Sequence, residues 1–246
     1  MLLSAGAIYG LAATSAFGFG KLEITGSTIT PEASIRETLA LKEGENLFEI
    51  ATDPLEARLL QIPAIAGVEI SLGLPDTVAV RIDERQPILV WQAGERRFVV
   101  DRAGLLFAGL GETTAPPDLP VIVDERGSSR KLDIGKTVDA VALDAATRLA
   151  SLTPGAIGSS ASTLAVGVTD ANGFVLRSVP ESWVAVFGFY GRSLRTTELV
   201  AGQVQALREL LAEVGEATVA QVILGDDRKG TYTPKSSPSG SASPAP

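Results

Sequence analysis

The strand pattern that ends at Glu84 constrains the fold of this chain more than any other feature. Residues 78–83 place an apolar side chain at every second position, which predicts a half-buried β-strand. The pattern breaks at Glu84 and Arg85, and Pro87, which has no backbone N–H for a sheet, follows two residues later. A new apolar run begins at Ile88. The chain must therefore leave one sheet here and begin another with almost no linker.

The residues before this break predict one unit of strand, helix, helix, strand, strand. We expect a strand over 21–25 closed by Gly26, and a helix with Thr30 as N-cap and Pro31 at its first position. Asp53 and Pro54 repeat that start signal for a second helix, which Pro63 ends. Two strands joined at residues 74–76 complete the unit. The expected apolar positions are Ile35, Leu39, Leu47, Phe48, Leu55, Leu59, Leu60 and Val80, with Leu39, Phe48, Leu59 and Val80 as the central core.

The residues after Pro87 predict a β-rich domain of antiparallel strands with two helices. Short apolar strands are expected near residues 88–92, 96–101, 104–109 and 119–125. A helix is expected over 138–152, then a meander of strands between 163 and 189. Residues 195–214 show the clearest helical period, and 217–225 would form the final strand. Residues 231–246 are rich in proline and serine, so we expect a disordered tail.

The first 20 residues contain no charged side chain. As a helix they would be about 30 Å long, which matches the hydrocarbon core of a bilayer. A cleaved signal peptide is the alternative, but it needs a basic n-region and the first basic residue is Lys21. We therefore expect a single membrane anchor over 1–20. We also expect that a short basic cytoplasmic tail precedes Met1 in the full protein.

The order of these elements resembles the FtsQ/DivIB family of bacterial cell-division proteins, in which the first unit is called a POTRA domain. The similarity covers roughly residues 19–110 and weakens beyond them. The matching residues are Ile24, Gly26, Gly44, Asn46, Leu47, Phe48, Pro63, Val68, Leu74, Pro75, Thr77, Glu84, Arg85, Pro87, Trp91, Asp101 and Gly104.

The resemblance implies an α+β protein with an N-terminal transmembrane helix (1–20), a POTRA-type β-α-α-β-β domain (21–85), a family-type β domain (86–230) and a tail (231–246). It implies a bitopic scaffold at the division septum that helps recruit and regulate septal peptidoglycan synthesis. The N-terminus would lie in the cytoplasm and the folded domains outside the cell membrane. Expected partners are other membrane division proteins of the FtsB/FtsL or DivIC/FtsL type. No enzyme activity and no cofactor are implied.

The break at Glu84, Arg85 and Pro87 has two interpretations. In the first, Glu84 and Arg85 clamp the junction and hold two domains at a fixed angle. In the second, they are an ordinary solvated strand end, because exposed ion pairs contribute little to stability.

The final predicted strand offers a candidate partner site. Residues 218–224 contain no charge, proline or glycine, so an exposed edge there would be open to an incoming strand. The alternative is that this strand is covered by the preceding helix or paired on both sides. The family resemblance favours docking. The expected partner-binding residues are Thr218, Ala220, Val222, Leu224, Asp226, Asp227 and Arg228, or Val219, Gln221 and Ile223 if the other face is used.

The composition excludes several classes of function. The chain has neither histidine nor cysteine, which removes histidine-dependent triads and the usual zinc ligand sets. A net charge of −8 makes nucleic acid an unlikely partner. An S-x-x-K string at 128–131 lacks the companion motifs of penicillin-binding enzymes. The string at 135–137 lacks the upstream glycine of a phosphate loop.

Two alternative functions are also considered from the sequence. A cell-wall hydrolase could work with carboxylates alone, and Asp118, Asp124 and Glu125 are candidates for such a pair. A POTRA-containing chaperone or secretion module would need many more strands after residue 85 than the remaining chain can supply.

Overall fold

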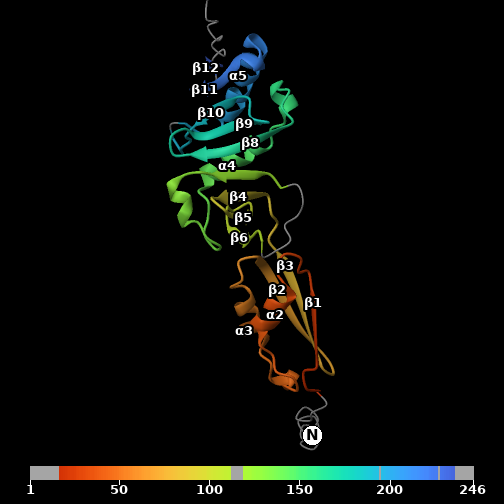
Figure 1. Cartoon of the computed structure of the whole chain (residues 1–246). Coiled ribbons are helices and arrows are strands. Elements are labelled where there is room, and N and C mark those ends of the chain that lie inside the picture. The colour runs from red at the N-terminus through yellow and green to blue at the C-terminus, as the bar shows by residue number, and fades with distance from the viewer. Residues whose placement is uncertain (1–16, 112–118, 194, 227, 236–246) are drawn as a thin grey trace, which may run out of the picture. The chain divides into compact units, whose positions relative to one another are not determined.

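The computed structural model describes residues 17–111, 119–193, 195–226 and 228–235. It divides the chain into two compact units. Unit 1 comprises Met1–Ile88, Phe98–Pro117 and Asp133–Lys136, and unit 2 comprises Leu89–Arg97, Asp118–Leu132 and Thr137–Pro246. The mixed α+β class predicted from the sequence is confirmed (Figure 1).

Most of the predicted membrane anchor lies outside the described residues. Within the parts that the structure describes, no helix is both long enough and apolar enough to cross a membrane. The predicted end of the anchor at residue 20 is wrong, because Gly18 already forms a β-bridge with Asn46. The fold therefore includes residues 17–20, which lie before the predicted domain boundary at Lys21.

Unit 1 contains the predicted strand-helix-helix-strand-strand order. Strands β1 (Lys21–Thr25), β3 (Thr77–Glu84) and β2 (Ile65–Gly73) form a sheet in that spatial order. The central strand β3 pairs with β1 in parallel and with β2 in an antiparallel hairpin. Helices α2 (Glu32–Leu39) and α3 (Thr52–Leu59) cover one face of this sheet (Figure 1). One apolar cluster fills the space between the helices and the sheet, with Ile35, Leu39, Leu47, Leu55, Leu59, Val78, Val80 and Ile82 buried.

The loop before α3 buries Leu47 but leaves Phe48 56% exposed, so the prediction that Phe48 belongs to the core is wrong. The Asn46 side chain accepts a hydrogen bond from the Phe48 N–H at 3.1 Å and begins a 3₁₀ turn over Leu47–Glu49. Consecutive side chains in such a turn point about 120° apart. Only one of the two apolar neighbours can therefore face the core.

Both helices of unit 1 begin without a side-chain cap, which differs from the sequence prediction. Pro31 is the N-cap of α2 and Ala51 is the N-cap of α3. The Thr30 N–H donates to the Glu84 carboxylate at 2.6 Å, so Thr30 belongs to a loop that Glu84 organises. Leu60 follows the last turn of α3 and is 46% exposed, although the sequence predicted it to face inward.

Glu84 closes the loop between β1 and α2. Its carboxylate accepts the backbone N–H groups of Thr28 at 2.7 Å, Ile29 at 2.8 Å and Thr30 at 2.6 Å, and the Thr28 hydroxyl at 2.7 Å. Partial burial by itself would raise the pKa of Glu84, but these hydrogen bonds outweigh it and lower the pKa below its usual range. Glu84 therefore stays ionised in the folded protein at neutral pH.

Arg85 joins the end of β3 to two other loops of unit 1. Its Nε donates to the Pro63 carbonyl at 2.8 Å, and its guanidinium contacts the Asp101 carboxylate at 3.0 Å. Asp101 also accepts the N–H groups of Ala103 and Leu105, each at 2.9 Å, in the turn after β5 (Arg96–Val100). The interpretation of this point as an ordinary solvated strand end is therefore wrong. A fixed angle between domains, with Glu84, Arg85 and Pro87 as the junction, stays a prediction.

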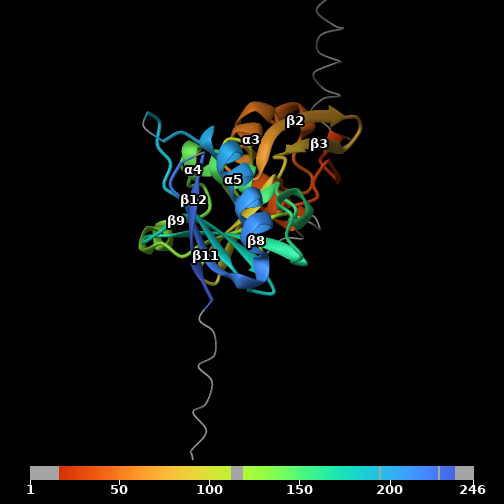
Figure 2. The ribbon, with the colours of Figure 1, turned by 90° about the horizontal axis from the view of Figure 1, so that it is seen from above.

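Unit 2 is a sheet with helices packed against it. The strands follow the spatial order β12 (Gly230–Pro234), β11 (Val219–Leu224), β10 (Val184–Gly188), β9 (Gly173–Val179), β8 (Thr163–Thr169), β7 (Val121–Asp124) and β4 (Leu89–Ala93). Helix α4 (Ala140–Ala150) packs against β7, β8 and β9, and α5 (Leu199–Val214) packs against β10, β11 and β12 (Figure 2).

The prediction of a purely antiparallel second domain is wrong. Strands β10 and β11, β7 and β8, and β4 and β7 pair in parallel. Parallel neighbours need a long crossover, usually a helix. The crossover from β7 to β8 contains α4, and the crossover from β10 to β11 contains α5. The two helices that the sequence predicted therefore form the crossovers of the parallel pairs β7–β8 and β10–β11, while the connection from β4 to β7 contains strands instead.

The neighbouring residues Leu47 and Phe48 allow a matched test of the unit 1 core. We expect Leu47→Ala to lower the free energy of unfolding by about 2–5 kcal/mol, because it opens a cavity under the sheet. Phe48→Ala should lower it by less than about 1 kcal/mol, because most of that ring already lies in water. Urea unfolding of both variants measures the difference. Equal losses would contradict this assignment of the core.

Candidate partner-binding edge of unit 2

Strand β12 is the outermost strand of the unit 2 sheet. It pairs antiparallel with β11, and β11 pairs on its other side with β10. The prediction that β11 is the last strand and lies at a sheet edge is therefore wrong. The prediction of a disordered tail from residue 231 is also wrong for 231–234, while residues 236–246 lie outside the described part of the chain.

The turn between β11 and β12 carries the signal that sequence reasoning missed. The Asp226 carboxylate accepts the N–H groups of Arg228 and Lys229, each at 3.0 Å, and these hydrogen bonds lower the pKa of Asp226. Asp and Gly residues between two β-forming segments are typical of a hairpin. Here the second segment, Thr231–Thr233, is so short that the proline- and serine-rich residues after it hid the pattern.

The predicted partner-binding residues fall into three groups. Val222 and Leu224 are 0% and 1% exposed, so their side chains belong to the core under α5. Thr218 lies in a 3₁₀ turn and donates its hydroxyl to main-chain carbonyls, and Ala220 lies at an irregularity in the pairing with β12. Among the other three, Asp226 and Arg228 are exposed in the turn and Asp227 is outside the described residues.

A proline substitution at Val222 would not be a clean test of binding at this edge. Val222 lies opposite Ala185 on β10 and opposite Tyr232 on β12. A proline there would remove a donor from the interior of the sheet and would destabilise the whole unit.

Two large apolar side chains are exposed beside the outer edge. Tyr232 is 44% exposed and lies opposite Val222, which places it on the face covered by α5. Ile223 is 47% exposed and lies opposite Thr231 on the other face. Arg228, Lys229 and Lys235 flank β12 in the sequence. The edge therefore combines main-chain groups, apolar contacts on both faces and basic residues at both ends.

The carboxyl ends of β10 and β11 are held together by a buried amide. Gln203 of α5 is fully buried, and its Nε2 donates to the carbonyls of Phe187 at 3.1 Å and Leu224 at 2.8 Å. Its Oε1 accepts the Tyr190 hydroxyl at 2.6 Å, and burial raises the pKa of Tyr190. The Arg195 guanidinium donates to the same two carbonyls. These contacts satisfy strand-end carbonyls that would otherwise be left without a partner.

The start of β11 is held by a second polar residue, Glu216. Its carboxylate accepts the Trp183 indole N–H at 2.6 Å, the Ser160 N–H at 2.8 Å and the hydroxyls of Ser159 and Ser160. Desolvation opposes the charge, but the hydrogen bonds from Ser159, Ser160 and Trp183 outweigh it and lower the pKa of Glu216 to about 2. Side-chain hydrogen bonds therefore hold both ends of β11, the strand with which β12 pairs.

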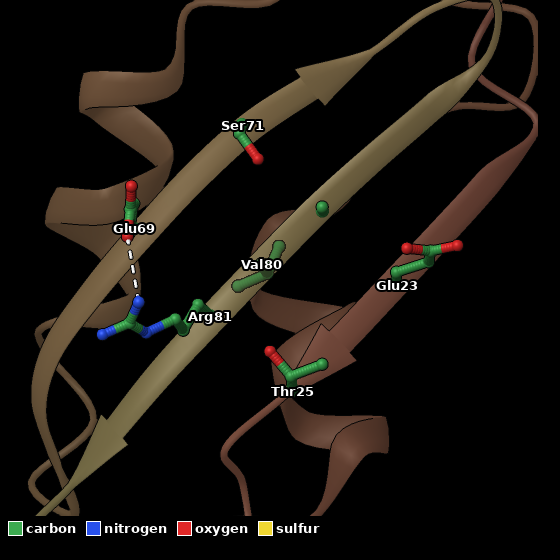
Figure 3. Close-up of a pocket in the computed structure, with 7 residues that line it drawn as sticks. Glu23, Thr25, Glu69, Ser71, Val80 and Arg81 are labelled. Atoms are coloured by element: carbon green, nitrogen blue, oxygen red, sulfur yellow. Dashed lines mark ion pairs between the residues drawn. The ribbon is translucent and has the colours of Figure 1, made fainter.

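The hollows among the described residues are less suited to binding than this edge. A shallow hollow on the open face of the unit 1 sheet is lined by polar side chains from all three strands, including Glu69 and Arg81, which pair at 3.8 Å (Figure 3). A cavity of about 210 Å³ near the start of α4 is smaller than typical small-molecule sites. No group of acidic residues in the described ranges has the arrangement of a metal site.

The carboxylates proposed for a hydrolase are committed to structural contacts. Asp124 is 1% exposed, accepts the Trp91 indole N–H at 3.0 Å and pairs with Arg126 at 2.7 Å. Glu125 pairs with Arg177 at 3.1 Å. Each carboxylate is thus neutralised by its own arginine, and Asp118 lies outside the described residues.

Comparison with known proteins identifies the first unit. Residues 17–85 match the family model described as a POTRA domain of the FtsQ type. The chain is 32% identical over 133 residues to the cell division protein FtsQ of Streptomyces bingchenggensis, covering 52% of this chain and 49% of that protein. It is 25% identical over 231 residues to FtsQ of Chloroflexus aurantiacus, covering 94% of this chain and 75% of that protein.

A shorter match joins the chain to a relative with a different name. It is 30% identical over 90 residues to the cell division protein DivIB of Clostridium acetobutylicum, covering 37% of this chain and 36% of that protein. The chain spans about half the length of the Streptomyces relatives that it matches.

The low pKa of Glu216 predicts how unit 2 responds to acid. Because the folded pKa is about 2 and the usual value is 4.5, this group stabilises the fold fully above pH 4.5, and the contribution is lost as the pH falls towards 2. We expect Glu216→Gln to be less stable than the parent at pH 7 and to lose less stability between pH 5 and 2. Denaturant midpoints at pH 7, 4 and 2.5 measure this. Parallel losses in both proteins would contradict it.

Proposed function

We propose that this chain, a member of the FtsQ/DivIB family of cell-division proteins, acts in septum formation by binding other membrane-anchored division proteins. In this proposal it helps to recruit and regulate septal peptidoglycan synthesis without catalysing a reaction itself. The FtsQ-type POTRA domain and the similarity to division proteins over most of the chain support a role in division. The exposed edge of unit 2 supports the more specific role in binding.

The observation that carries this proposal is the position of β12 at the border of its sheet. An edge strand offers unpaired N–H and C=O groups to an incoming strand, and the added strand gains affinity from main-chain hydrogen bonds. Strand β12 has only five residues, so few main-chain bonds can form. Tyr232 and Ile223 therefore supply much of the affinity in this proposal, as apolar anchors on the two faces.

The charges near the edge suggest the chemistry of the partner segment. Arg228, Lys229 and Lys235 are basic, while the chain as a whole has a net charge of −8. In the turn before β12, Asp226 and Asp227 offset Arg228 and Lys229, so Lys235 is the unbalanced charge of the edge. It favours a partner strand with an acidic residue near that end of β12, because complementary charge speeds association and sets register. We propose that this partner is a membrane division protein of the FtsB/FtsL or DivIC/FtsL type.

The N-terminal residues would keep both proteins in one membrane. Residues 1–16 contain no charged side chain and directly precede the folded unit. We propose that they belong to a single-pass anchor, with the N-terminus in the cytoplasm and both units outside the membrane. Anchoring in the same membrane raises the effective concentration of the partner. A short strand can then be a sufficient site.

The exposed side chains at the edge allow a test in which folding is preserved. We expect Tyr232→Ala combined with Ile223→Ala to weaken binding of the FtsB- or DivIC-type protein of the same organism about tenfold or more, because central apolar anchors commonly contribute at least about 1.4 kcal/mol. Binding is measured by titration in detergent micelles.

The matched control is Phe189→Ala, which removes a 54% exposed ring from the same unit, at the end of β10. It should leave the affinity unchanged. Unchanged affinity of the double variant, with its melting temperature preserved, would show that the partner binds elsewhere.

A further inference from the structure

We propose that the tip of unit 1, formed by Phe17, Phe48 and Leu74, inserts into the lipid–water interface of the membrane that anchors the chain. This inference rests on the anchor that is part of the proposed function. It adds a second membrane contact, made by the folded domain itself.

Three segments that are distant in sequence meet at this tip. The Phe19 N–H donates to the Glu45 carbonyl at 2.7 Å, and the Gly44 N–H donates back to the Phe19 carbonyl at 2.8 Å. The Gly20 N–H donates to the Asp76 carbonyl at 2.9 Å. The residues that follow the apolar N-terminal segment are therefore fastened to the loop before α3 and to the β2–β3 turn, at one end of unit 1 (Figure 1).

Both of these loops expose a large apolar side chain. Leu74 is 61% exposed and Phe48 is 56% exposed, which makes them the two most exposed large hydrophobic residues of the described ranges. Phe48 packs edge-to-face with Phe17 at 5.3 Å between ring centroids. Phe48 cannot turn inward, because Leu47 already fills the core position of that turn. Exposed Phe and Leu side chains of this kind are typical of the apolar face with which interfacial segments enter the headgroup boundary.

The position of the tip favours lipid over a protein as its occupant. Phe17 is covalently joined to a stretch of 16 residues without charge. If that stretch enters a bilayer, the tip is the part of unit 1 that must lie at the membrane surface. Even weak insertion of a few side chains then becomes effective, because the chain is already held there.

The charges around the tip indicate that apolar contact would drive this insertion. Glu43, Glu45, Glu49 and Asp76 outnumber the two nearby lysines, Lys21 and Lys42. Anionic headgroups would repel such a surface. We therefore expect insertion in vesicles of phosphatidylcholine, and no gain when anionic lipid is added.

Added tryptophans can report this contact in the full chain reconstituted into phosphatidylcholine vesicles. We expect Phe48→Trp and Leu74→Trp to lose fluorescence when the vesicles contain lipid brominated near the headgroup. The native Trp91 and Trp183 are 0% and 1% exposed, so they provide an unquenched background. The matched control is Leu60→Trp, at a 46% exposed position five residues before Ile65, where β2 begins at the end opposite the tip. This variant should keep its fluorescence.

The outcomes separate this inference from the anchor on which it rests. Each variant is first floated with the vesicles and checked for an unchanged melting temperature. A chain that fails to float would overturn the anchor and this inference together. A chain that floats but shows no quenching at positions 48 and 74, or equal quenching at position 60, would overturn the tip contact alone. Stronger quenching in anionic vesicles would also overturn it, because attraction by charge would then replace apolar insertion.

Discussion

The arrangement of unit 1 depends on two adjacent side chains at the end of β3. Glu84 accepts three backbone N–H groups from the loop between β1 and α2, and Arg85 donates to the carbonyl that precedes β2 and to Asp101. Ile29 and Thr30 are buried, and a buried main-chain group without a partner would cost about 1–3 kcal/mol. The same two residues interrupt the strand pattern in the sequence. Their charge is therefore needed to join the loops at this end of the unit.

Unit 2 uses the same principle for β11, the strand next to the outermost strand β12. Glu216 fastens the start of β11 and Gln203 fastens its end, each by several hydrogen bonds to groups far away in sequence. If β12 binds a partner strand, its pairing with β11 leaves it little conformational freedom to lose. Preorganisation of this kind improves affinity. The buried part of the candidate site is thus the set of polar contacts at both ends of β11. Its exposed part is the short strand β12 with Tyr232, together with Ile223 on β11.

The most strongly hydrogen-bonded carboxylates of the described residues have structural roles. Glu84 and Glu216 have lowered pKa values because they accept many hydrogen bonds, so both stay ionised at neutral pH. A general acid or base needs a pKa near the working pH, which is the opposite adjustment. Asp124 and Glu125 are likewise paired with arginines. Of the acidic residues that made a hydrolase conceivable, Asp124 and Glu125 are therefore held in structural contacts.

Local patterns in the sequence were sufficient for the element order of unit 1, for the helices of unit 2 and for most of the core. Alternation in β3, prolines near helix starts and the period of α5 all act between residues close in the chain, so they can be read without a structure. The exposure of Phe48 and the pairing of β12 could not be read in this way. The geometry of the 3₁₀ turn decides which of Leu47 and Phe48 is buried. Whether a strand lies at the edge of a sheet depends on which other strands of the chain pair with it. Tertiary structure alone decided that Val222 is covered, that Tyr232 is exposed and that Glu84 serves a loop more than 50 residues before it in the sequence, because each depends on contacts between segments that no local pattern joins.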